Sequence, residues 1–163
     1  MSKNWSAEDF WQFSLGIYAI EDVKETCLAL QNDFSVNVNI LLLCGYLNLN
    51  NRQLSKLQFV DLSSFIAPSV ADVEAIRQKR IVAKMNQPSI YSQLLAEELA
   101  LEKLQQQNII HFLNQHQTSI KSMSNLQVYL SSLDKQGDPD LECKIGHLDD
   151  LFSLHTVSTN IVS

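Results

Sequence analysis

The sequence predicts an all-α fold, a single-domain bundle of about six to seven helices around one central apolar helix. The chain of 163 residues holds only 4 glycines and 3 prolines, which is too few for the many tight turns of a β-sandwich or barrel. Its hydrophobic content of 45% is that of a globular protein. At this length a chain can bury a core without disulfides or metals.

The central helix is predicted from the stretch VNVNILLLCGYLNL at residues 36–49. From Ile40 to Leu47 only Gly45 interrupts the apolar side chains, and a helix that is apolar on every side belongs in the interior. The run is shorter than the roughly 20 residues that a bilayer requires, so we expect no membrane insertion. We therefore place a helix over about 37–49, with Asn37 as its N-cap.

Two helices are predicted before this segment. Ser6 begins a capping-box pattern with Asp9 three residues later, and an aromatic helix that includes Trp11 and Tyr18 follows. A second helix from about Asp22 carries one apolar seam. Aromatic residues at helical spacing usually form core, although the same side chains could line a ligand pocket.

Three short segments are similar to a known family. They read F-W-x-F-S-L at residues 10–15, C-L-x-L-Q at 27–31 and V-N-x-x-L-L at 38–43. In these segments the chain resembles a bacterial family of small conserved hypothetical proteins, of unknown function, and it departs from the family pattern at Asn37, where the family usually has Asp. The resemblance is clear over the first third and weakens through residue 85. It implies an all-helical fold and no particular activity.

A helix is next expected over residues 54–66, and Pro68 should end it or kink it sharply. Ser69 would then cap a new helix whose second half is basic. Arg77 and Arg80 lie one turn apart and could hold one anion together. With Lys84 they are candidates for a docking patch that binds an acidic partner or a phosphate-bearing ligand. The alternative is a solvated helix end, because cations suit a helix C-terminus.

Four residues are candidates for a ligand pocket. Besides Trp11 and Tyr18, they are Asn39, whose amide could hydrogen-bond to a neighbouring helix or to a ligand, and Gly45. Glycine inside a helix costs roughly 1 kcal/mol relative to alanine. Gly45 is therefore explained by the close approach of another helix or of a bound molecule.

The longest helix is predicted over residues 89–114, and its apolar stripe is diluted by polar residues at 98, 102, 105 and 108. Such a helix often projects from a bundle or pairs with another chain, so a homodimer through this helix is one expectation. A last full helix is predicted over 119–133. We assign residues 1–135 to the helical bundle domain and 136–163 to a C-terminal extension with one short helix and a mobile end.

The net charge narrows the possible partners, and the cysteine content narrows the possible cellular compartment. The net charge is −6, while residues 51–87 carry six lysines and arginines against three acids. An acidic protein with one basic segment is a poor nucleic-acid binder. The three cysteines form no C-x-x-C pair, which together with the start of the chain favours the reducing cytoplasm.

No motif for catalysis or for a metal is found. The four histidines lack the Glu-x-x-His spacing of di-iron bundles, and Gly-rich phosphate loops and G-x-S-x-G elbows are absent. We expect no cofactor and no metal, and an enzyme is disfavoured. The leading hypothesis is a protein–protein interaction or regulatory module with an unknown protein partner, and the alternative is a carrier or sensor of a small apolar or anionic ligand.

Overall fold

The structure is a computed structural model that describes residues 4–135 and 137–160. Among these residues it has seven helices and a small two-stranded sheet. The order is α1 (Ala7–Tyr18), α2 (Glu21–Phe34), α3 (Val38–Leu49), β1 (Arg52–Gln53), α4 (Lys56–Asn86), α5 (Pro88–Gln115), β2 (Ser119–Ile120), α6 (Asn125–Ser132) and α7 (Pro139–Asn160). The all-α prediction is confirmed. No helix in the described ranges has both the length and the apolarity to cross a membrane.

Helix α3 is the centre of the bundle, as its sequence predicts. Every residue from Ile40 to Leu47 is buried, and α1, α2, α5, α6 and α7 all pack against it. Asn37 caps the helix by accepting a hydrogen bond from the Ile40 amide at 2.9 Å. Gly45 faces α7, where the ring of Phe152 lies so close that an added Cβ would be 3.0 Å from two ring carbons.

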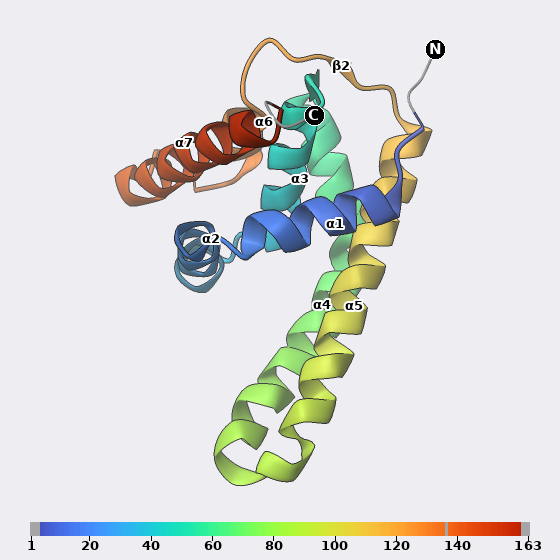
Figure 1. The fold of residues 1–163 in the computed structure, drawn as a ribbon, viewed down its shortest axis with the longest axis vertical. Helices are drawn as coiled ribbons and strands as arrows, with labels where there is room; N and C mark the ends of the chain where they lie inside the picture. Colours follow the sequence, from blue (N-terminus) through green and yellow to red (C-terminus); the bar gives the residue numbers. More distant parts are fainter. Residues whose placement is uncertain (1–3, 136, 161–163) are drawn as a thin grey trace.

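Helices α4 and α5 form an antiparallel hairpin that extends well beyond the other helices (Figure 1). We call this hairpin the arm. α4 runs without interruption through Pro68, so of the two predicted outcomes, a helix end or a kink, the helix end is wrong. Pro68 is exposed; it costs α4 one backbone hydrogen bond, which the extensive packing of α4 against α5 offsets. Ser69 does not cap a new helix; its hydroxyl donates to the Ile66 carbonyl at 2.7 Å.

The predicted helix over 119–133 begins too early. Residues 119 and 120 instead form β2, which pairs antiparallel with β1 so that Arg52 is opposite Ile120. Asn125, which is fully buried at the start of α6, binds the β1 segment by donating to the Arg52 carbonyl and accepting from the Leu54 amide. Helix α6 begins directly after Ser124, whose side chain caps the helix.

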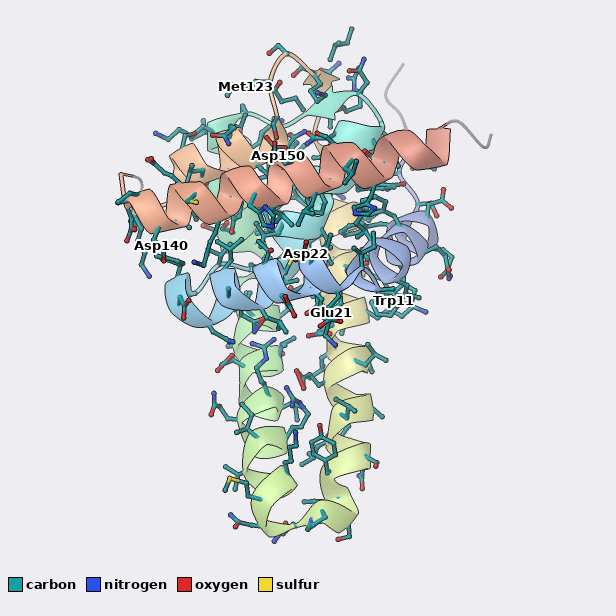
Figure 2. The ribbon with its side chains drawn as sticks, turned by 60° about the vertical axis from the view of Figure 1, so that its left-hand side comes forward. Trp11, Glu21, Asp22, Met123, Asp140 and Asp150 are labelled. Atoms are coloured by element: carbon teal, nitrogen blue, oxygen red, sulfur yellow. The ribbon has the colours of Figure 1, made fainter. Side chains whose placement is uncertain are left out.

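Helix α7 is far longer than the short helix expected in the C-terminal extension. It has 22 residues, crosses the bundle beside α2 (Figure 2), and contributes core residues such as Leu148 and Phe152. The segment therefore belongs to the core. The mobile end expected for this segment lies partly outside the described residues.

Candidate functional site

The basic half of α4 lies on the arm. Residues 76–99, which form the outer part of the arm, contain Arg77, Lys79, Arg80 and Lys84 against two acids, Glu97 and Glu98. In Figure 2 this part of the arm hangs below α2 and is well separated from α7. Four positive charges thus lie on the arm, from Arg77, which is close to α2, to Lys84 near the tip.

Arg77 and Arg80 converge on one anion, and that anion is Glu98 of α5. Arg80 donates through Nε to Glu98 Oε2 and through Nη2 to Oε1 at 3.3 Å, while Arg77 Nε lies 3.4 Å from Oε1. The Glu98 side chain is only 8% exposed. The hydrogen bond to Glu98 raises the pKa of Arg80 above its ordinary value. The pair therefore holds the two helices of the arm together.

Arg77 also connects the arm to the body of the bundle. Its guanidinium lies 2.8 Å from Glu74 and 3.6 Å from Glu102. With the Gln31 amide oriented so that its oxygen faces α4, that oxygen accepts from Arg77 Nη1 at 2.7 Å. Helices α2, α4 and α5 thus meet at one guanidinium. Burial, with a smaller effect of the nearby Glu98 charge, raises the pKa of Glu102.

Lys84 differs from the two arginines. Within the described part of the chain neither Lys79 nor Lys84 makes an ion pair, and both side chains are exposed. Of the three predicted anion-binding residues, Arg77 and Arg80 are thus engaged with glutamates of this chain, whereas Lys84 points its charge to solvent.

The four pocket candidates are not gathered around one cavity. Trp11 is half-buried on α1, with the Lys103 ammonium 5.4 Å from its ring centre. Tyr18 lies near the Arg77 cluster, and burial is the largest cause that raises its pKa to about 12. Asn39 faces α5, whereas Gly45 faces Phe152 on another side of α3. A helix side chain thus fills the space beside Gly45.

Asn39 belongs to a cluster of buried amides between α1, α3 and α5. It donates to Gln105 Oε1 at 2.9 Å and accepts from Gln106 Nε2 at 3.0 Å, and Gln106 also donates to the Ser14 hydroxyl at 2.9 Å. Gln105 and Gln106 are 2% and 1% exposed. These amides are satisfied largely by one another, so they fix how the base of the arm sits against α1 and α3.

A surface groove of about 300 Å³ lies elsewhere, between α2 and α7. It is lined by Glu25, Thr26, Ala29, Cys143, Lys144 and His147, and none of the predicted pocket residues reaches it. No group of three or more His, Cys, Asp or Glu side chains in the described ranges is placed to hold a metal ion. None of these groove residues was predicted from the sequence to be part of a site.

Glu98, Gln105 and Gln106 are the structural residues that site prediction from sequence missed. For Glu98 and Gln105 the signal was the presence of polar residues at core spacing in the long helix, at positions 98, 102 and 105, whereas Gln106 had no such signal. That spacing indicated partial burial, and it did not reveal that the partners of Glu98 are two arginines from the preceding helix.

The fold and the site define an all-helical protein with a projecting helical hairpin whose two helices are joined by a buried arginine–glutamate cluster. Residues 9–109 match the model of a family described as protein of unknown function (DUF2390), and the chain belongs to this family. The resemblance to a family of unknown function is thereby confirmed, and the match runs from α1 to near the end of α5. No curated protein and no solved structure matches the chain.

Proposed function

We propose that this protein is a cytoplasmic protein–protein interaction module that binds its partner through the arm. The observation that carries the proposal is the surface of the distal arm. Among the large apolar side chains there, Met85 is 83% exposed and Val82 is 57% exposed. Exposed apolar residues that gather on a projecting element are typical of a binding surface.

The cations of the arm divide into two roles under this proposal. Arg77 and Arg80 keep α4 and α5 together through Glu98, and Lys79 and Lys84 are free to meet an acidic partner. Reversing the charge of Arg77 and Arg80 would place two further carboxylates beside Glu74, Glu98 and Glu102 in a poorly solvated site. Those two substitutions would therefore unfold the arm rather than test binding.

The state of the cysteines supports the proposed compartment. Cys27 and Cys44 are buried free thiols and Cys143 is exposed. A chain with three unpaired thiols is suited to a reducing environment.

The test is site-specific photo-crosslinking in cells of the protein's own host. A photoreactive phenylalanine analogue replaces Val82 on the arm in one variant and Ile120, 71% exposed on β2, in the control variant. We expect a discrete protein adduct from position 82 and none from position 120. Absence of an adduct at 82, or the same adducts from both positions, would refute the proposal.

The alternative of a ligand carrier gives a different result in a parallel measurement. Native mass spectrometry of the protein purified from its host would then show an added small-molecule mass that disappears on denaturation. We expect no such mass, because the space beside Gly45 is filled by Phe152 and Asn39 is bonded to Gln105 and Gln106.

A further inference from the structure

The net charge of the chain is concentrated on two helices. α2 and α7 together carry eight aspartates and glutamates against Lys24 and Lys144, a charge of −6. The remaining residues carry ten acids against ten lysines and arginines. α2 and α7 pack against each other, and Figure 2 shows them side by side, with Asp22 on α2 and Asp140 and Asp150 on α7. This pair of helices is therefore an acidic face on a protein that is otherwise balanced in charge.

The groove between α2 and α7 lies on this acidic face. Its volume is about 300 Å³, and one row of residues from each helix borders it at spacings of three and four. The row on α2 comprises Asp22, Glu25, Ala29 and Asp33. The row on α7 comprises Asp140, Cys143, His147 and Asp150. We call these residues the groove rows.

The groove rows run in opposite directions along the groove. Glu25 and His147 line it together, whereas Asp33, further along α2, lies near Lys144. The pKa of Lys144 is raised by its hydrogen bond to Asp140 and, to a smaller extent, by the charge of Asp33. Each end of the groove therefore has one aspartate from each helix: Asp33 with Asp140, and Asp22 with Asp150.

Three lysines lie on or beside these helices, and they leave most of the acidic charge uncompensated. Lys144 pairs with Asp140 at 2.9 Å, the one ion pair that the groove rows make among the described residues. Lys24 lies on the same side of α2 as Gln31, which faces α4, so it points away from the groove. Lys135 donates to the carbonyl of the last residue of α2 at 3.1 Å, and two aspartates between α6 and α7 outweigh its charge.

The charge of the groove selects among possible occupants. Nucleic acids and anionic membranes would be repelled. A second copy of this chain offers no row of free cations, because Arg77 and Arg80 are paired with Glu98 and Lys79 lies at the level of Glu97 on the arm. The complementary occupant is therefore a cationic segment of another protein.

We propose that the groove between α2 and α7 binds a basic helix of a partner protein. This surface is separate from the arm, so the inference goes beyond the proposed function. From Asp22 to Asp33 the α2 row is about 16 Å long at 1.5 Å per residue. The bound helix would thus carry lysine or arginine at two places about three turns apart, with small or apolar residues between them. The walls of the groove strengthen the attraction by focusing the field of the acids.

The middle of the groove has the shape that this occupant requires. Thr26, Ala29 and Cys143, which line it, all have small side chains. A helix above them can approach α2 and α7 to the interaxial distance of about 8–10 Å that packed helices usually have. A helix laid in such a groove uses one side only, with its contact residues at spacings of three and four. Because the contact is short and charged, we expect micromolar dissociation that weakens as salt is added.

The test uses a designed helix as its probe. The probe is a peptide of about 18 residues with alanine and leucine on one side and two pairs of lysines three turns apart, and the control peptide has glutamate in place of each lysine. Two-dimensional NMR spectra of the isotope-labelled protein map the binding site, and fluorescence anisotropy of the labelled peptide gives the dissociation constant. We expect the probe to shift amide signals in residues 22–33 and 140–150, and the control peptide to shift none.

Charge-reversal variants of the protein then test the groove itself. Asp33→Lys combined with Asp150→Lys changes one residue at each end of the groove and should raise the dissociation constant of the probe about tenfold, which corresponds to about 1.4 kcal/mol. The matched control is Asp61→Lys combined with Asp72→Lys, at exposed positions of α4. This control changes the net charge by the same amount and should bind the probe nearly as tightly as the unmodified protein does.

Equal weakening by the two double variants would show that net charge alone attracts the probe, and it would overturn the inference. Absence of binding, or amide shifts centred outside α2 and α7, would overturn it as well. Tighter binding of spermine than of the probe at the same residues would identify a small polyamine, rather than a helix, as the occupant. The crosslink at position 82 of the arm tests the proposed function separately, so the failure of one is distinguishable from the failure of the other.

Discussion

Replacing Gly45 by alanine should destabilise the protein, although alanine is the better helix former. The added Cβ would lie 3.0 Å from Cδ2 and Cε2 of Phe152 and 3.2 Å from Cζ. Phe152 is 1% exposed, so its ring cannot swing into solvent to make room. Either α7 moves away from α3 or the ring adopts a strained conformation.

The expected magnitude follows from two opposing effects. Removing glycine from a helix interior gains about 1 kcal/mol, whereas forcing a methyl group into a packed core costs about 1–3 kcal/mol. We expect a net loss of about 1 kcal/mol, which lowers the melting temperature by about 2–4 °C in a chain of this size. Gly16 and Gly146 are the controls, because a Cβ at either position meets no heavy atom within 4 Å. Alanine at those two positions should raise the melting temperature by a similar amount.

The assay is thermal and urea unfolding followed by far-ultraviolet circular dichroism on the three alanine variants. A second comparison adds Phe152→Leu, which shortens the side chain that the new methyl group meets. Gly45→Ala should cost less in that background, and the difference measures the coupling between the two positions. A melting temperature that rises in Gly45→Ala as it does in Gly16→Ala would refute the close packing of α7 on α3.

Three further predictions concern charged and titratable groups. Glu98→Ala leaves two guanidinium groups facing each other and should lower the unfolding free energy, measured by urea titration, by about 3 kcal/mol. The control is Glu97→Ala at the preceding, exposed position, which should change the unfolding free energy by less than about 0.5 kcal/mol. Cys143 is exposed while Cys27 and Cys44 are buried, so a thiol reagent should label one cysteine in the native protein and three in urea, and fast native labelling of all three would contradict the fold. Burial raises the pKa of Cys27 from 9.0 to about 12, so this thiol loses its proton at a lower pH in the unfolded chain than in the folded protein. The unfolding free energy should therefore fall between pH 9 and 12, by up to about 4 kcal/mol. Cys27→Ala should make this fall shallower, and an unchanged fall would show that other groups cause it.

Local sequence signals predicted the parts of the fold that depend on local physics. The helix at 37–49 is apolar on all sides and therefore could only be central. Its cap at Asn37 and the cap at Ser6 depend on hydrogen bonds that span three residues. The long helix at 89–114 corresponds to α5, whose bounds are Pro88–Gln115.

Contacts between distant residues caused the errors. Ile120 follows a helical apolar pattern, but β1, nearly seventy residues earlier, pairs with it and leaves its side chain 71% exposed. Pro68 predicts a helix end or a kink because proline removes a backbone hydrogen bond, and sequence alone does not reveal that packing against α5 holds α4 together through this position. Glu98 is buried only because Arg77 and Arg80 from another helix neutralise it, and no pattern within α5 contains that information.

The packing of Phe152 against Gly45 also sets the order in which the fold can be completed during synthesis. The two residues are more than 100 positions apart in the chain, and at 5–20 residues per second the ribosome needs about 5–20 seconds to add that length. Throughout this interval the apolar side of α3 that packs against α7 in the folded protein has no helix to pack against. The emerging polypeptide is therefore most exposed to aggregation, and most dependent on chaperones, just before α7 is released.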